Sequence, residues 1–400
     1  MNHLTWVEVS QSALAHNIKT LKNRLNDGVV LCPCVKANAY GHGLVESARV
    51  FIEAGADWLA VNALYEAEAL REAGIEDREG NPVPIYIMGY TALDNLEKVW
   101  RLGCRQVVYD TETIERLGEL SADAGKDGAK FGGPLNLHIK VETGNNRQGV
   151  LIEDLVKFAK LIESFDGLRI EGLATHFANI EDTTDHSFAM KQVERFREAA
   201  DRLSDVGIEV PIKHCSNSAA TLLFKEVHFD MVRTGISNYG MWPSNETKVS
   251  MGELSDDLVE LRPAFTWKAK VAQVKTVPSG DFIGYGCTHR TTRDIKMAII
   301  PIGYYDGYDR GLSNTSHVLI RGKRAKLLGR VCMNIIMADV TDIEGVALED
   351  EVVLMGKQAF DNGEKLVYDE ISAEQFADWI GTINYEVTTR INDRIPRIIV

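Results

Sequence analysis

A lysine that closes an apolar run is the first residue in the chain that could do chemistry. Lys36 lies at the end of VLCPCVKA, residues 30–37. Burial makes an ammonium group easier to deprotonate, and the neutral amine is a nucleophile that can form a Schiff base. Most lysines at strand ends are simply solvated, so Lys36 needs support from other residues.

Two later segments have the composition of a phosphate-binding site. Ser218 opens the segment after PIKHCS (211–216), and Gly235 and Ile236 close the run MVRTGI (231–236). A glycine lets a ligand approach the backbone closely, and backbone N–H groups bind phosphate well. A Schiff-base lysine combined with a phosphate cradle makes pyridoxal 5'-phosphate (PLP) the first cofactor to test.

The elements that would position these residues alternate between short apolar runs and longer amphipathic stretches. The apolar runs cover residues 30–37, 58–61, 84–89, 105–110, 135–142, 169–176, 211–216 and 231–236. Helical patterns such as LVESARVFIEAG and FAMKQVERFREAADRLSDVG lie between them. Eight strands, each followed by a helix, predict a (β/α)8 TIM barrel. In such barrels the functional groups lie at the carboxyl ends of the strands, and phosphate binds to the loops after strands seven and eight.

A change of pattern after about residue 245 predicts a second domain. Segments such as FTWKAKVAQVKTV, KMAIIPIG and DEVVLMG are rich in β-formers and broken by Gly, Asp and Pro, which is typical of antiparallel strands. One helix is expected after the capping box Ser372-Ala-Glu-Gln375. We expect a barrel domain at residues 10–242 and a mostly antiparallel β-domain at 243–400, and the run TWVEV (5–9) could pair with the second domain.

Composition and charge limit the class of partner. The chain has 400 residues, of which 45% are hydrophobic, and this length favours two domains. A formal net charge of -14 would repel nucleic acid and anionic membranes, so a small-molecule substrate is expected. The N-terminal segment lacks the features of a signal peptide, so a cytoplasmic location is expected. The six cysteines show no zinc-binding spacing, and no metal site is predicted.

The run VKANAYGHG at 35–43 resembles the PLP-lysine motif of the alanine racemase family. Further segments match the family in the same order: KVETGNNRQG (140–149), GLATHFA (172–178), CSNSAA (215–220), VRTGI (232–236), GYG (284–286), IGYYDGY (302–308), GRVCMN (329–334), NYEV (384–387) and RIPR (394–397). This resemblance extends over essentially the whole chain. It implies PLP-dependent conversion of L-alanine to D-alanine, as used in cell-wall synthesis, by a homodimer with shared active sites.

The resemblance implies two catalytic bases. Lys36 would carry PLP and act on the Cα proton of the D-enantiomer, and Tyr285 of the partner subunit would act on that of the L-enantiomer. Racemisation needs both, because a proton removed from one face must be replaced from the other. A free phenol has a pKa of about 10, so His176, which contacts Arg233 in the family pattern, would help to lower it. A tyrosine between glycines is otherwise usually a packed aromatic residue.

Other matched residues would bind the cofactor and the substrate. Arg233 resembles the arginine that faces the ring nitrogen of PLP, where a guanidinium that keeps its proton discourages side reactions. Arg147 would lie near the cofactor's phenolic oxygen and the substrate carboxylate, and Lys140 matches a position that is carbamylated in some relatives. Met333 would meet the substrate carboxylate through its backbone. The phosphate contacts implied are Tyr40, Ser218, Gly235, Ile236 and Tyr385, with Asn217 beside them.

Two departures from the family pattern bear on the substrate. Asn334 stands where the family usually has Asp, and Asn146 stands where a Gly or His often precedes the arginine. Loss of a fixed negative charge changes which substrates are repelled. Alanine is the first substrate expected, and a broader-specificity racemase for serine or basic amino acids is the alternative. A PLP barrel decarboxylase and a PLP-holding protein without turnover are two readings from other classes.

Overall fold

The chain forms two compact units. The structure is a computed structural model that describes residues 3–254, 259–361 and 363–400. Within the described residues, one unit consists of Ser12–Ala39 and Leu44–Arg262, and the other consists of Met1–Gln11, Tyr40–Gly43 and Pro263–Val400.

The first unit contains the eight parallel strands of a barrel. They are β2 (Val30–Leu31), β3 (Leu59–Val61), β4 (Ile85–Ile87), β5 (Arg105–Val108), β6 (Leu135–Lys140), β7 (Leu168–Ala174), β8 (Ile212–His214) and β9 (Met231–Val232). Strands β3 to β8 pair in sequence order, and β2 pairs with β9. A parallel bridge between Cys34 and Ala60 and a 2.9 Å bond from the Arg233 N–H to the Ser216 carbonyl link the two sheets. The predicted barrel is therefore confirmed.

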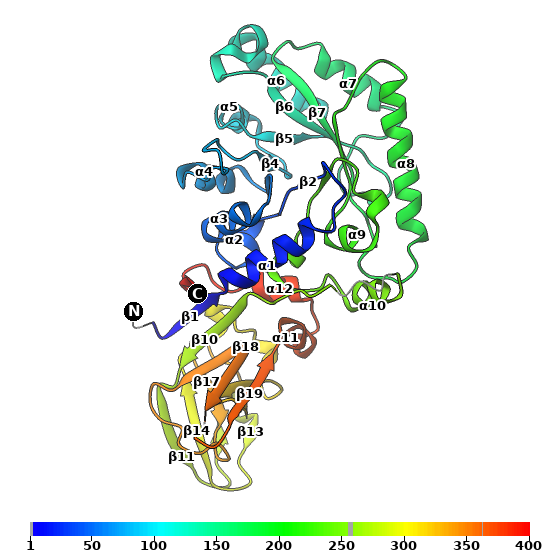
Figure 1. The fold of residues 1–400 in the computed structure, drawn as a ribbon. Coiled ribbons are helices and arrows are strands. Elements are labelled where there is room, and N and C mark those ends of the chain that lie inside the picture. The colour runs from blue at the N-terminus through cyan, green and yellow to red at the C-terminus, as the bar shows by residue number, and fades with distance from the viewer. Residues whose placement is uncertain (1–2, 255–258, 362) are drawn as a thin grey trace. The chain divides into compact units, whose positions relative to one another are not determined.

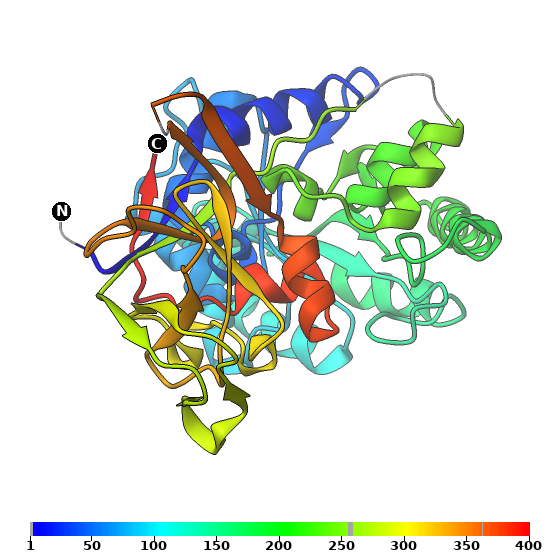
Figure 2. The ribbon, with the colours of Figure 1, turned by 90° about the horizontal axis from the view of Figure 1, so that it is seen from below.

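Helices lie around the outside of these strands (Figures 1 and 2). They are α1 (Gln11–Lys22), α3 (Leu44–Ala54), α4 (Leu64–Glu72), α5 (Leu96–Arg101), α6 (Thr111–Ala124), α7 (Leu155–Glu163), α8 (Ser187–Ser204), α9 (Ser218–Leu223) and α10 (Asn245–Leu254). In α8, Val193, Phe196 and Leu203 are buried, and their spacing of three and seven residues puts them on one face of the helix. This face of α8 therefore forms part of the hydrophobic core between the helices and the strands.

The second unit is built from strands that are mostly antiparallel. They are β1 (Thr5–Val9), β10 (Phe265–Lys270), β11 (Gln273–Val277), β12 (Phe282–Ile283), β13 (His289–Arg290), β14 (Ile295–Ile300), β15 (His317–Ile320), β16 (Lys323–Lys326), β17 (Ile336–Asp339), β18 (Glu351–Asp361), β19 (Leu366–Ile371) and β20 (Arg397–Ile399). The main sheet has the order β16-β15-β18-β10-β1-β20, and β19 pairs with β18. Strand β1 pairs antiparallel with β10 and parallel with β20. Alternate residues of β10 are buried, as the two-residue period of a strand requires.

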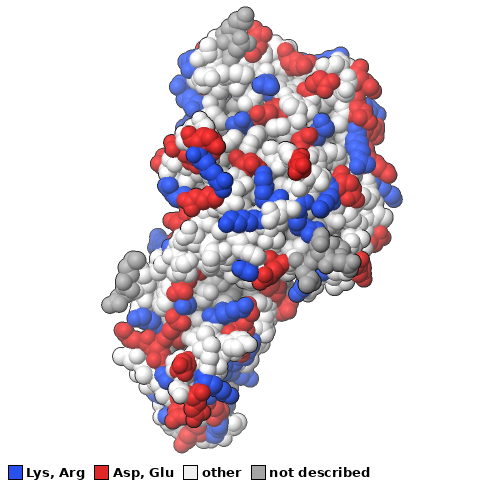
Figure 3. All heavy atoms as spheres, in the orientation of Figure 1, with Lys and Arg blue, Asp and Glu red and all other residues white. Residues whose placement is uncertain are grey.

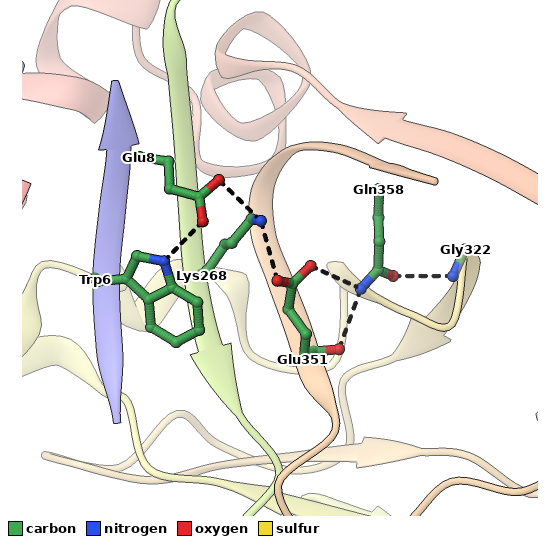
Figure 4. A network of polar contacts seen from close by, with 6 residues as sticks. All are labelled: Trp6, Glu8, Lys268, Gly322, Glu351 and Gln358. Carbon is green, nitrogen blue, oxygen red and sulfur yellow. Dashed lines mark hydrogen bonds and ion pairs between the residues drawn. The ribbon is translucent and has the colours of Figure 1, made fainter. Parts of the chain in front are cut away.

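A polar network crosses the main sheet (Figure 4). The ammonium group of Lys268 lies 2.9 Å from a carboxylate oxygen of Glu8 and 3.0 Å from one of Glu351. The Gln358 side chain donates to the Glu351 carbonyl at 3.1 Å and accepts the Gly322 N–H at 2.9 Å. These contacts join β1, β10 and β18 side by side, in addition to the backbone ladder.

Among its described residues the second unit contains two α-helices after its strand β19, whereas the sequence predicted one helix. The predicted helix is α11 (Ala373–Ile380), and the Ser372 hydroxyl accepts the Gln375 N–H at 3.1 Å. The additional helix is α12 (Asn384–Thr389). Its sequence NYEVTT contains mostly weak helix formers, but Asn384, Val387 and Thr388 are buried, so tertiary packing overrides propensity here.

The surface carries charges of both signs. Figure 3 shows acidic and basic side chains interspersed on the face that it draws. None of the helices in the described residues combines the length and the apolar composition that crossing a bilayer requires.

Candidate active site

Lys36 lies directly after the first barrel strand. The backbone ladder continues past β2, with the Cys34 N–H donating to Thr234 and the Val35 N–H donating to Ala60, at 2.7 and 2.8 Å. The Lys36 side chain is partly exposed. Lys36 therefore lies at the carboxyl end of a barrel strand, and active sites of such barrels lie at this end.

The segment after Lys36 has an unusual backbone. Ala37, Asn38, Ala39 and Tyr40 have φ values of 52°, 53°, 52° and 53°, so the element α2 (Lys36–Tyr40) is largely a left-handed turn. Each non-glycine residue in this conformation costs about 1–2 kcal/mol. Such strain persists only where surrounding contacts enforce it, and it concentrates at functional sites.

Hydrogen bonds hold this left-handed turn. The Asn38 side chain accepts the Leu44 N–H at 2.8 Å, which fixes the start of α3. The Ala39 N–H donates to the Val35 carbonyl at 2.8 Å. The turn therefore has a single defined path from the strand to the helix.

Arg233 begins a buried chain of polar side chains at the end of the eighth strand. Its guanidinium donates to Nδ1 of His214 and to the Thr175 carbonyl, the latter at 2.8 Å. His214 Nε2 lies 2.7 Å from His138 Nδ1. His138 Nε2 lies 3.0 Å from a carboxylate oxygen of Glu171. The chain thus runs from a cation at the strand end to a carboxylate.

The protonation states of the two histidines follow from their surroundings. Burial, and then the charge of Arg233, hold the pKa of His214 well below its ordinary value. Burial also lowers the pKa of His138, although Glu171 opposes this effect. Both rings are therefore neutral, so His214 accepts from Arg233 and donates to His138, and His138 donates to Glu171. Every bond in the chain then has one donor and one acceptor.

Glu171 completes the chain at its other end. Nε of Arg105 donates to the same carboxylate at 3.1 Å, and the pKa of Glu171 is lowered from its ordinary value by its bonds to His138 and Arg105, despite its burial. The carboxylate is therefore ionised. Its negative charge partly balances Arg233 through two neutral rings.

Several cations share the mouth of the barrel. Burial lowers the pKa of Lys140 well below its ordinary value, and the charges of Arg233 and Arg147 add to this effect. The pKa of His176 is likewise held well below its ordinary value by burial and by the charges of Lys140, Arg233, Arg147 and Lys36. His176 is therefore neutral, and the mouth favours anionic ligands. Nothing in the described contacts shows a hydrogen bond between His176 and Arg233.

The expected phosphate cradle joins the loops after the last two strands. Asn217 caps α9 by accepting the Ala220 N–H at 3.0 Å, and its amide donates to Glu181 at 2.6 Å. The Ser218 hydroxyl accepts the Gly235 N–H at 2.8 Å and the Ser237 N–H at 3.4 Å. Asn217 therefore positions Ser218, while Ser218 and the backbone from Gly235 onward face one another.

Tyr40 and Tyr385 come together in the second unit. Their ring centroids lie 6.1 Å apart. Arg397 donates to the Gly41 carbonyl at 2.9 Å, and a β-carbon at Gly41 would lie 2.1 Å from the Thr388 carbonyl oxygen. The glycine is required at this close approach, and it places Tyr40 beside the α12 helix that carries Tyr385.

Tyr285 also belongs to the second unit. It begins the 3-10 helix η5 (Tyr285–Cys287), and the flanking Gly284 and Gly286 have φ values of 71° and 73°. Ile283, directly before this turn, packs in a core cluster with Met297 and other residues. The Tyr285 side chain is 72% exposed. The turn is thus anchored while the phenol is presented on the surface of its unit.

The loop that carries Met333 is fixed by a neighbouring loop. The Tyr304 and Tyr305 N–H groups donate to the carbonyls of Cys332 and Met333, both at 3.0 Å. A β-carbon at Gly303 would lie 2.3 Å from each of these two carbonyl oxygens, so only glycine fits there. Met333 is 55% exposed.

The structure divides the expected site residues between the units. The barrel unit brings together, at the carboxyl ends of its strands, Lys36, Arg147, His176, Asn217, Ser218, Arg233, Gly235 and Ile236. The second unit carries Tyr40, Tyr285, Met333 and Tyr385.

Sequence reasoning missed the residues behind Arg233. His138 and His214 stand in apolar strands, where a lone histidine gives no sign of its partner. The signal that existed was Gly172, which pairs with His138 in the strand register. A β-carbon at Gly172 would lie 2.2 Å from His138 Nδ1, so the glycine makes room for the ring.

Fold and site together define a barrel enzyme with a lysine at the end of its first strand and with several basic side chains at the mouth of the barrel. The chain matches the model of the alanine racemase N-terminal domain over residues 9–243 and that of the C-terminal domain over residues 264–399. The chain therefore belongs to the alanine racemase family, and the resemblance inferred from the motifs is confirmed.

Individual relatives match over nearly their full length. Alanine racemases of Halothermothrix orenii and Carboxydothermus hydrogenoformans are each 40% identical to this chain, over 98% and 99% of it and over 96% and 99% of their own lengths. The structure of alanine racemase from Bacillus anthracis with bound L-Ala-P has a TM-score of 0.88 and 34% identity, covering 100% of this chain and 96% of that one. Alanine racemase from Bartonella henselae with covalently bound pyridoxal phosphate has a TM-score of 0.82 and 25% identity, with both chains fully covered at 100%.

Proposed function

We propose that this protein is a PLP-dependent racemase that interconverts L-alanine and D-alanine. Lys36 and the Ser218–Gly235 cradle lie at the same end of one barrel, and this observation carries the proposal. Arg233 follows β9, the strand that pairs with β2 before Lys36. The names of the relatives, and the L-Ala-P and pyridoxal phosphate of two of their structures, support the same substrate and cofactor.

The residues at the cradle fit a phosphorylated cofactor. The hydroxyls of Thr234 and Ser237 are buried and have no hydrogen-bond partner within the described structure. Buried polar groups normally find partners, so their location beside the Gly235 and Ser237 N–H groups suits an additional polar ligand. Lys36, Ser218, Gly235 and Ile236 would hold PLP, with further contacts from Tyr40 and Tyr385.

PLP, when bound, supplies an electron sink for the electron pair left on the substrate Cα. Arg233 keeps its proton toward this sink because a guanidinium does not readily lose a proton, and the His214–His138–Glu171 chain orients it. Arg147 donates to the substrate carboxylate. Lys36 moves the proton on one face of Cα, and Tyr285 moves it on the other.

We further propose that Tyr285 and Met333 complete the site of a second subunit. Both side chains are more than half exposed, and the nearby Phe282 and Ile335 are exposed by 56% and 43%. A group of exposed apolar side chains favours a protein interface. A homodimer in which each subunit lends its tyrosine to the other explains why this residue lies on an open surface.

Asn334 bears on the choice of substrate. Its side chain hydrogen-bonds to Asp306, whose pKa is raised by burial. An amide in place of the family's usual carboxylate removes one negative charge near the expected substrate carboxylate. Alanine remains the proposed substrate, and serine or a basic amino acid is the second candidate.

Purified protein with added PLP should be incubated with each L-amino acid, followed by chiral separation of the products. D-alanine should form fastest, until both enantiomers are present in equal amounts. Release of CO2 without a D-enantiomer would instead identify a decarboxylase, and the absence of any product would identify a PLP-holding protein.

A further inference from the structure

A single buried carboxylate holds the backbone beside Lys36. Glu66 is 2% exposed, and its Oε1 accepts the Ala37 N–H at 2.6 Å. Its Oε2 accepts the N–H groups of Asn62 and Ala63 at 2.8 and 3.0 Å. One side chain thus joins the start of α4, the end of β3 and the residue that follows Lys36.

Ala37 is the first residue of the left-handed turn. The residue before Lys36 is fixed by the barrel ladder, because the Val35 N–H donates to Ala60. The residue after Lys36 is fixed by Glu66 instead. Hydrogen bonds to a charged group are about twice as strong as neutral ones, so this contact can hold a backbone that its own φ disfavours.

We propose that Glu66 is a positioning residue that fixes the backbone of Lys36 through the Ala37 N–H and so aims the lysine amine at the substrate Cα. The inference rests on the proposed function only in assigning a catalytic role to Lys36. The hydrogen bond itself can be tested without any cofactor.

Glu66→Gln is a selective variant because Oε1 accepts one hydrogen bond and Oε2 accepts two. An amide has one oxygen that accepts, and its nitrogen only donates. Keeping the amide oxygen on Asn62 and Ala63 preserves two bonds, whereas keeping it on Ala37 preserves one. The NH2 group should therefore face the Ala37 N–H, which breaks this contact while the start of α4 remains capped.

Glu68→Gln provides the matched control. Glu68 lies on the same helix and makes a surface ion pair with Lys98 at 3.5 Å. Its replacement removes the same charge from α4 but leaves Ala37 untouched.

The first measurement is residue-resolved amide hydrogen exchange, with and without PLP. In the wild-type protein the Ala37 amide should be protected like that of Val35. In Glu66→Gln the Ala37 amide should exchange about 10- to 100-fold faster, while the exchange rates of the Asn62 and Ala63 amides stay unchanged. In Glu68→Gln all three amides should exchange at their wild-type rates. A freely exchanging Ala37 amide in the wild-type protein, which needs no variant to fold, would overturn the proposal.

The second measurement is exchange of the substrate α-proton with solvent deuterium. Displacement of Lys36 should slow exchange from D-alanine by about 10-fold or more and leave exchange from L-alanine, assigned to Tyr285, within about twofold. An equal loss for both enantiomers would show that Glu66 acts only on general stability and would overturn its positioning role. A pyridoxyl label on another lysine would refute the proposed function separately, while the amide exchange would still decide the contact.

Discussion

His138 Nδ1 and His214 Nε2 lie 2.7 Å apart in the barrel interior, and this contact joins Arg233 at the strand end to Glu171, the fourth side chain in the chain of hydrogen bonds. Because both rings are buried and neutral, the pair relays orientation and partial charge but does not itself carry a positive charge. Arg233 is therefore oriented, through hydrogen bonds, by residues that need not contact any ligand.

Gly172→Ala should damage this support. The added methyl would lie 2.2 Å from His138 Nδ1, so the ring must move, and overpacking of this kind costs about 1–3 kcal/mol of unfolding free energy. The midpoint of chemical denaturation and the racemisation rate should both fall relative to wild type. Gly252→Ala in α10 is the control, since among the described residues no atom outside the glycine's own helical backbone and its neighbours lies within 4 Å of its β-carbon position. If Gly172→Ala had the stability and the racemisation rate of the wild type, the added methyl would not clash with the His138 ring.

Stability should decrease as the pH falls through the titration range of unfolded histidine. The pKa values of His138, His176 and His214 are lowered in the folded protein, first by burial, whereas in the unfolded chain they are about 6.5. Below this pH the unfolded state binds protons that the folded state does not. Each histidine therefore lowers the free energy of unfolding by up to about 1.4 kcal/mol per pH unit.

Denaturation midpoints measured between pH 8.5 and 5.5 test this. The midpoint should drop between pH 7.5 and 5.5, with most of the fall below about pH 6.5. A midpoint that is constant or rises toward pH 5.5 would contradict neutral buried histidines.

The barrel could be predicted because each apolar run is short and bounded, and the strand ends then selected Lys36, Ser218 and Gly235 by a general rule of such folds. The α12 helix could not, since its residues favour it only through packing. Glu66 gave no signal because the residue three positions before it is Ala63 and not a Ser or Thr of a capping box. The roles of Tyr285 and Met333 came from family resemblance alone, because local chemistry does not distinguish an exposed tyrosine from a catalytic one.

Tyr285→Phe should separate the two half-reactions. Exchange of the L-alanine α-proton with solvent should fall by about 10²–10⁴-fold, as expected for loss of a positioned base, while exchange from D-alanine through Lys36 continues. Net racemisation should be lost in both directions. Exchange from L-alanine at the wild-type rate would exclude Tyr285 as the second base and would direct attention to His176.

Mixing Lys36→Ala and Tyr285→Phe chains tests the shared site. In a mixed dimer one site contains both changes and the other contains neither. Random pairing makes about half the dimers mixed, each with one intact site, so about a quarter of full activity should return. Absence of recovery after demonstrated subunit exchange would indicate that each chain supplies its own tyrosine.

Lys36 should carry PLP. The protein incubated with PLP should be reduced with borohydride, digested and mapped by mass spectrometry, with Lys36→Ala as the control. The pyridoxyl group should be found on Lys36, and the control should be unlabelled, because Lys36 is the lysine at the carboxyl end of the first barrel strand. A label on Lys140 or any other lysine in the wild-type protein would contradict the account.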